Sequence, residues 1–192
     1  MTEKLTCTNR KGDIYYLREV SGKRGTRIVC STNESENDLS TIPETHEISE
    51  SPNGQVSCRK KVKSNITREE ASYAEDILPS MVDANIRLFV ETKKNALIVH
   101  SADTSNFNEM AKFAQKFCAD PAGIKAITEG NLRYEPVLKL ELADKESRIF
   151  AAFRMCWLGA SEEWMFLKEG SVYGLVEEFG PHIGNESFYE LF

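Results

Sequence analysis

Residues 134–142 read YEPVLKLEL, and this stretch decides the fold class. Its leucines alternate with a lysine and a glutamate, so a strand formed here has one apolar face and one solvated face. Such alternation is typical of antiparallel sheets that carry helices on one side. We therefore predict an α+β fold with an antiparallel sheet and helices packed mainly on one face.

The segments around this stretch supply the other strands of that sheet. Residues 148–158 are apolar on both faces except at Arg154, which predicts a central strand, and residues 163–168 form a further β segment. Residues 86–92 and 95–100 are apolar runs around a polar turn, as expected of a hairpin.

Four stretches carry helix signals. Residues 67–70 have capping-box spacing before an apolar stripe that Pro79 is expected to end. Residues 105–118 repeat apolar side chains at i, i+3, i+4 and i+7. Short helices are also expected over 120–129, after an Asp-Pro pair, and over 172–179, after a Gly-Ser pair.

The front of the chain has the punctuation of short strands and tight turns. Residues 4–8, 14–20 and 26–31 predict a three-stranded meander. Residues 46–60 predict a separate hairpin, because its Asn53-Gly54 pair tolerates the positive φ angles that a tight turn needs. The acidic stretch at 32–40 is expected to be an exposed loop.

Charge divides the chain in the same place. Residues 1–64 hold 11 lysines and arginines against 9 acidic residues, whereas residues 65–192 hold 13 against 21. The two parts carry net charges of +2 and -8, and the whole chain -6. We predict a basic β-rich module at 1–61 and an acidic α+β body at 66–192, with one fused unit as the alternative.

Several classes of protein are disfavoured by the sequence. No apolar run reaches the roughly 18 residues of a membrane span, and the N-terminus lacks the layout of a secretory signal. We therefore expect a cytoplasmic protein with no membrane partner. Five cysteines, odd in number and far apart in the sequence, predict buried thiols rather than disulfides or a zinc site.

No motif assigns a catalytic residue, a metal ligand or a cofactor. The chain has no G-x-G-x-x-G, no Walker lysine and no H-E-x-x-H. Residues 100–103 place His, Ser and Asp within four positions, but a nucleophilic triad needs them to converge from separate elements. Acidic pairs at 162–163 and 177–178 fit a solvated surface.

The front module contains the main candidate binding site. Basic residues at two turns lie close in sequence to two strand tyrosines, and cations with interleaved aromatics can hold phosphates and stack bases. Lysines at strand ends also block unwanted strand pairing, which is the structural alternative. The candidate binding residues are Arg10, Lys11, Tyr15, Tyr16, Lys23, Arg24 and Arg27.

Both ends of the chain carry a family resemblance. Residues 11–17, 42–44 with 47–48, and 52–56 resemble the front of a group of uncharacterised bacterial hypothetical proteins of unknown function. Residues 185–191 resemble the C-terminus of the same group. The resemblance implies that front and body belong together as one unit, and it implies no catalytic residues.

These observations favour a non-catalytic binding protein. Its basic N-terminal surface is expected to contact nucleic acid or an acidic protein surface. The alternative is a small enzyme with a site in a cleft between the N-terminal module and the body. The sequence leaves the activity, the ligand and the oligomeric state open.

Overall fold

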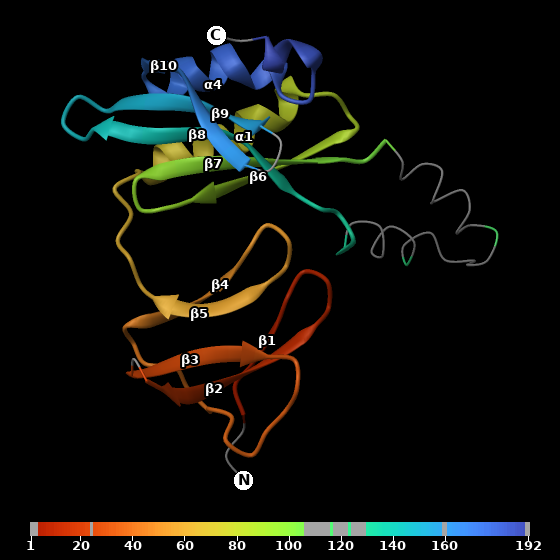
Figure 1. Ribbon diagram of the computed structural model, residues 1–192, viewed down its shortest axis with the longest axis vertical. Helices are drawn as coiled ribbons and strands as arrows, with labels where there is room; N and C mark the ends of the chain where they lie inside the picture. Colours follow the sequence, from red (N-terminus) through yellow and green to blue (C-terminus); the bar gives the residue numbers. More distant parts are fainter. Residues whose placement is uncertain are drawn as a thin grey trace. The chain divides into compact units, whose positions relative to one another are not determined.

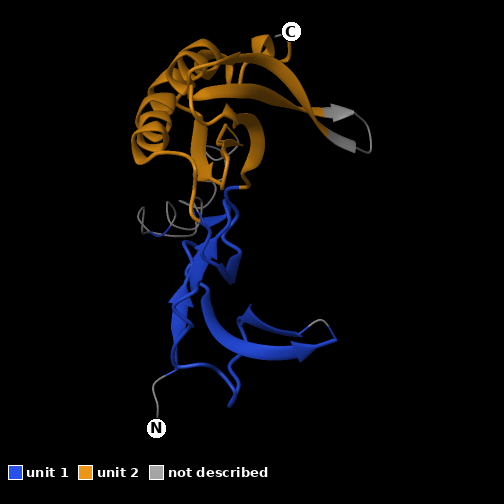
Figure 2. Ribbon diagram, turned by 90° about the vertical axis from the view of Figure 1, so that its left-hand side faces the viewer, with its two compact units in different colours: residues 1–62, 111–132 blue, residues 63–110, 133–192 orange. Residues whose placement is uncertain are grey.

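A computed structural model describes residues 4–23, 25–105, 116, 123, 130–158 and 161–190 (Figure 1). The chain divides into two compact units, residues 1–62 with 111–132 and residues 63–110 with 133–192 (Figure 2). We call them the front unit and the body unit. The helices predicted at 105–118 and 120–129 fall almost wholly outside the described residues. Independent folding of residues 1–61 and 66–192 stays a prediction.

Two antiparallel sheets make up the described part of the front unit. Strands β1 (Thr6–Thr8), β2 (Ile14–Gly22) and β3 (Gly25–Ser31) form one sheet with β2 in the middle. Strands β4 (His46–Glu50) and β5 (Val56–Lys60) form a hairpin. Gly54 in its turn has a φ of +83°, as the Asn-Gly pair predicts. The predicted N-terminal β module is therefore confirmed.

Asn9 joins these two sheets at their turns. Its side-chain oxygen accepts hydrogen bonds from the backbone N–H of Lys11 at 3.0 Å and of Asp13 at 2.8 Å. Its Nδ2 donates to the carbonyl oxygen of Gly54 at 2.7 Å. Asn9 is buried, and a buried amide requires such partners. The β1–β2 turn is thereby fastened to the β4–β5 turn.

The acidic loop after β3 is only partly exposed. Residues 32–34 face solvent, but the side chain of Asp38 is fully buried and forms an ion pair with Arg18, Nε to Oδ1 at 3.0 Å. The backbone N–H of Leu39 donates to the carbonyl of Leu17 at 2.7 Å. The expectation of an exposed loop is wrong for this part, because the partner that buries Asp38 lies twenty positions earlier in the chain.

A five-stranded antiparallel sheet forms the centre of the body unit. Its strands are β6 (Ile86–Thr92), β7 (Ala96–Asp103), β8 (Glu135–Asp144), β9 (Ile149–Leu158) and β10 (Ser161–Gly170). Their order is β10-β9-β8-β7-β6, so each strand pairs with the strands that precede and follow it along the chain. β8 is the middle strand, and β9 lies between β10 and β8, so it is flanked on both sides as expected of a central strand.

Helices α1 (Arg68–Met81) and α4 (Val172–Phe179) cover one face of this sheet (Figure 1). Fully buried strand residues beneath them include Leu97, Leu138 and Phe150. The predicted α+β fold is therefore confirmed. Pro79 lies inside α1 instead of ending it, because a proline in the last turn removes only one hydrogen bond.

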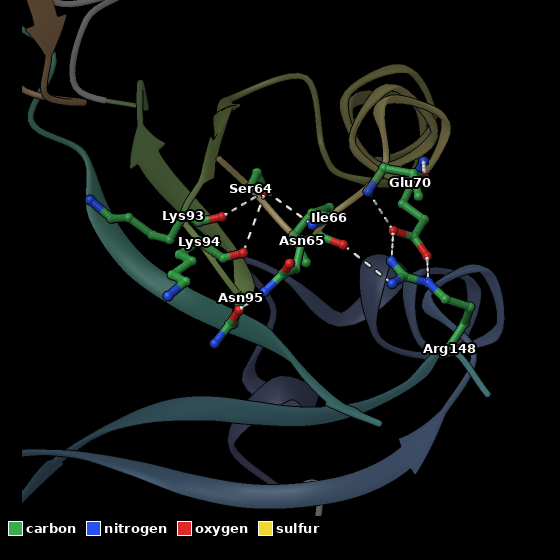
Figure 3. A network of polar contacts seen from close by, with 9 residues as sticks. Ser64, Asn65, Ile66, Glu70, Lys93, Lys94, Asn95 and Arg148 are labelled. Carbon is green, nitrogen blue, oxygen red and sulfur yellow. Dashed lines mark hydrogen bonds and ion pairs between the residues drawn. The ribbon is translucent and has the colours of Figure 1, made fainter. Parts of the chain in front are cut away.

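Glu70 fastens the start of α1 to the sheet (Figure 3). It accepts a hydrogen bond from the backbone N–H of Thr67 at 2.8 Å and completes the capping box. It also pairs with Arg148 in the β8–β9 turn, through Nε at 2.9 Å and through Nη2. Arg148 donates in addition to the carbonyl of Asn65 at 3.2 Å. One buried carboxylate thus connects the helix, its entry segment and the sheet.

The same carboxylate makes the stability of the body depend on pH. Burial opposes ionisation of Glu70, but hydrogen bonds from Arg148 and Thr67 outweigh it and lower its pKa. The pair therefore stabilises the fold fully above the unfolded pKa of about 4.3. That stabilisation is lost as the pH falls through the lower, folded pKa.

Replacing Glu70 tests this connection. We expect Glu70→Gln to lower the free energy of unfolding at pH 7 by roughly 3 kcal/mol, because Arg148 loses its buried partner. The variant should also lose less stability than the wild type between pH 5 and pH 3. Urea denaturation across this range measures both effects. Glu69→Gln is the matched control, since Glu69 is exposed in the same helical turn; equal losses in the two variants contradict the assignment.

Candidate functional site

Arg10 and Lys11, the first two predicted binding residues, make contacts inside the front unit. The backbone N–H and Nε of Arg10 donate to Oε1 of Glu50 at 3.1 and 2.9 Å. The aliphatic part of the Lys11 side chain lies against Gly54. Both residues therefore hold the β1–β2 turn against the β4–β5 hairpin, and Arg10 already has its counter-ion.

The other predicted basic residues lie at the opposite end of β2. Lys23 is exposed in the β2–β3 turn, and Arg27 is exposed on β3, opposite Val20. Arg24 lies outside the described residues. Eight steps of about 3.3 Å separate the two ends of β2, so the two turns are roughly 26 Å apart.

The two tyrosines are divided between the faces of the sheet. Tyr15 and Tyr16 are consecutive on β2, and consecutive strand residues point to opposite sides. Tyr16 shares its face with Arg27, whereas Tyr15 lies on the face of the fully buried Leu17. The seven predicted residues are thus not one surface. Tyr16 and Arg27 share one face of the β2–β3 hairpin, and Lys23 lies in its turn. Neither cation forms an ion pair with another described residue.

Three cysteines that are far apart in sequence lie near one another in the front unit. Burial, followed by the neighbouring thiols of Cys58 and Cys7, raises the pKa of Cys30. Burial also raises the pKa of Cys58. A raised pKa keeps a thiol protonated and unreactive at neutral pH, so these residues act as small apolar groups.

His100 and Glu91 form the most enzyme-like pair of the body unit. His100 is buried, and its Nε2 lies 3.2 Å from Oε2 of Glu91. Burial lowers the pKa of His100 despite the carboxylate, so the ring is neutral at pH 7. Within the described residues, Glu91 is its only hydrogen-bond partner, and no cluster of His, Cys, Asp and Glu is placed to hold a metal ion.

β10 presents the longest unpaired backbone edge of the body sheet. It pairs with β9 on one side, and no strand of the described chain pairs with its other side. Backbone groups of residues 163–169 make no described hydrogen bond outside that ladder. The outer edge therefore offers a row of N–H and C=O groups to another chain segment.

Large apolar side chains flank this edge on both faces of the sheet. Phe166 is 52% exposed and Met165 38% exposed, and their consecutive positions point them to opposite faces. Phe166 packs edge to face on Phe153, with ring centroids 5.7 Å apart. The ammonium group of Lys139 lies 4.3 Å from the centre of the Phe153 ring and 5.4 Å from that of Trp164. This arrangement is a cation–π cluster beside a strand edge.

Arg154 is the most unusual side chain near the edge. It is 6% exposed, and its neighbours across β8 and β10 are Leu138 and Met165. Its Nη2 donates to Sδ of Met165 at 3.4 Å, and its Nε has no hydrogen-bond partner. No carboxylate among the described residues forms an ion pair with it.

The fold itself does not explain this guanidinium. A thioether sulfur is a weak acceptor, and a buried charge without a counter-ion costs several kcal/mol. An apolar side chain at this position would be buried without that cost. Arg154 therefore points to a negatively charged group that is not supplied by the described residues.

The sequence contained a signal for Arg154 but not for the edge. Arg154 interrupts the apolar residues of 148–158, although the stretch as a whole predicts a buried strand. Identification of β10 as an outer strand requires the strand order, which the sequence pattern does not give. Phe166 belongs to a predicted β segment, and no local sequence feature marks it as exposed.

Comparison with known proteins adds no further residue assignments. No family model, curated protein or solved structure matches the chain. No helix among the described residues is both long and apolar enough to cross a bilayer. The basic hairpin of the front unit and the β10 edge of the body unit are therefore the two candidate sites.

Proposed function

We propose that this chain is a non-catalytic binding protein that takes up an extended peptide segment along the outer edge of β10. The observation that carries the proposal is the unpaired edge flanked by exposed Met165 and Phe166. An added strand makes main-chain hydrogen bonds with such an edge, and its alternate side chains contact the two faces. Phe166 and Trp164 then form the apolar contact on the face opposite α1 and α4.

The structural alternative is an edge protected against pairing. Natural outer strands are often blocked by charges and bulges, and β10 has a register shift between Phe166 and Lys168. Lys168, however, is held by Glu178 on α4 at 2.8 Å. The stretch from Glu163 to Phe166 runs in regular register and carries the apolar pair instead of a lysine. The blocking features therefore lie at one end of β10 and leave this stretch open.

At β6, the other outer strand of the sheet, a side chain already uses backbone acceptors. In β6, Nη1 of Arg87 donates to the carbonyl of Ala84 at 2.7 Å and to that of Ile86 at 3.4 Å. These bonds use backbone acceptors at the start of β6, so β10 is the better edge for strand addition.

Charge favours a peptide over nucleic acid at this site. Residues 65–192 carry a net charge of -8, and such a body repels a phosphate backbone. Among the described residues, the cations near the edge are the buried Arg154 and two lysines, Lys139 and Lys168, which pair with Glu141 and Glu178. A peptide with few charges has no comparable penalty.

A fluorescent peptide tests the proposal. The peptide has nine residues, alternating threonine and valine with a central glutamate, so that its valines line one face of the strand. Fluorescence anisotropy should show saturable binding to the full chain. Phe166→Ala should weaken binding about tenfold, which corresponds to about 1.4 kcal/mol of lost apolar contact.

Tyr189→Ala is the matched control, because Tyr189 is similarly exposed at 56% but lies in the C-terminal 3-10 helix η2 (Glu186–Tyr189). It should bind the peptide as the wild type does. Equal affinities of both variants, or no binding by the wild type, contradict the proposal. Sedimentation tests self-association at the same edge. A concentration-dependent dimer that the peptide dissociates would show that the natural occupant of the edge is a second copy of the chain, and this result would also overturn the proposal.

A second candidate function keeps the basic front as a binding surface for single-stranded nucleic acid. The observation that favours it is the exposure of Lys23 and Arg27 on one hairpin, with Tyr16 on the face of Arg27. Cations can contact phosphates there while the ring stacks on a base. Arg10, Arg18 and Arg59 contribute less, since each already pairs with an acidic side chain.

Charge reversal at the hairpin tests this second function. Binding of a single-stranded oligonucleotide should weaken with salt by a log–log slope of about -0.7 for each phosphate neutralised. Lys23→Glu with Arg27→Glu should reduce both affinity and slope, whereas Arg10→Gln should leave the slope unchanged. No binding at about 50 mM salt removes the nucleic-acid function.

A further inference from the structure

We propose that Arg154 makes the β10 edge selective for a segment that carries an aspartate or glutamate on the face of the sheet covered by α1 and α4. This inference rests on the proposed peptide binding and names the chemistry of the partner. It uses the buried guanidinium that neither the fold nor the other residues of the edge explain.

The position of Arg154 places its charge toward the open edge. Arg154 is the direct cross-strand neighbour of Met165, so both side chains lie on the same face. The contact between Nη2 and the Met165 sulfur shows that the guanidinium reaches across to β10. A strand added to β10 lies only about 4.8 Å further out. Its side chain opposite Met165 would therefore meet the guanidinium.

No acidic side chain of this chain takes that role within the described residues. Glu163 lies on the same face, two residues before Met165 on β10, but it is exposed and forms no ion pair with Arg154. Glu178 is bound to Lys168. The described residues therefore supply no counter-ion for Arg154.

A carboxylate fits this position better than a neutral side chain. Guanidinium and carboxylate can form two parallel charge-assisted hydrogen bonds, which are about twice as strong as neutral ones. The amide of a glutamine has the same shape but no charge, and it leaves the guanidinium without a counter-ion. Differences between charged and neutral partners of this kind correspond to about 10- to 100-fold in affinity.

A symmetric dimer centred on Met165 does not supply this carboxylate. In that register, the Met165 residues of the two β10 strands lie opposite one another, so each Arg154 meets a thioether and no acidic side chain. An acidic peptide segment supplies the counter-ion that this dimer lacks.

Two peptides that differ in one group test the selectivity. The first is the nine-residue threonine–valine peptide with a central glutamate, and the second has glutamine in its place. In both peptides the valines are on the side of Phe166, so the central residue is on the side of Arg154. At about 150 mM salt, the wild type should bind the glutamate peptide at least tenfold more tightly. Arg154→Met, which preserves length and apolar packing, should bind both peptides equally.

Two further variants separate the possible outcomes. Arg154→Lys keeps the charge without the planar fork and should retain only part of the preference. It also serves if Arg154→Met does not fold, which thermal unfolding would show. Glu163→Gln should leave the preference intact or increase it, because it removes the nearest competing carboxylate.

The results distinguish this inference from the function on which it rests. If the wild type binds neither peptide, the proposed function fails. If it binds both equally, peptide binding stands and the selectivity is wrong. If Arg154→Met keeps the tenfold preference, another cation recognises the glutamate and the assignment to Arg154 is overturned.

Discussion

Burial of Leu97, Leu138 and Phe150 beneath α1 and α4 is the constraint on which the body unit depends. In a strand, the residues that alternate with these must lie on the other face, so their burial fixes the direction of every side chain in the sheet. That requirement brings Lys139, Phe153 and Trp164 together on the opposite face. It also leaves the sheet open at β10, because the five strands pair in order and do not close.

The same constraint makes a charged side chain at position 154 unexpected. Its register places it on the face covered by the helices, level with Leu138, where an apolar side chain would be expected. A buried ion pair such as Glu70 with Arg148 contributes to a fold because both charges are satisfied. Among the described residues, Arg154 has only a sulfur contact. The contrast between the two arginines separates the structural role of Arg148 from the binding role that we propose for Arg154.

Most of the fold follows from sequence, because its signals are local. The Leu-Lys-Leu-Glu-Leu alternation predicts β8 and its two faces, the Thr67–Glu70 spacing predicts the start of α1, and Asn53-Gly54 predicts the β4–β5 turn. What failed depends on distant partners. The burial of Asp38 requires Arg18, and the place of β10 at the edge requires the strand order.

The candidate site was harder to predict for the same reason. Nearness in sequence grouped Arg10 with Lys23, but a nine-residue strand separates them. Glu50, which neutralises Arg10, comes from another hairpin. Exposure of Phe166 and the missing counter-ion of Arg154 are properties of an assembled sheet. Composition could indicate only that one arginine interrupts an apolar strand.

Amide hydrogen exchange of β10, resolved by NMR with and without the glutamate peptide, tests the central claim most directly. In the free protein, the outward-facing amides between Glu163 and Phe166 should exchange rapidly, while those bonded to β9 exchange slowly. Saturating peptide should slow the outward-facing amides at least tenfold and leave the front unit unchanged. Outward-facing amides that are already protected in the free protein, or that remain fast when the peptide is bound, would contradict the claim.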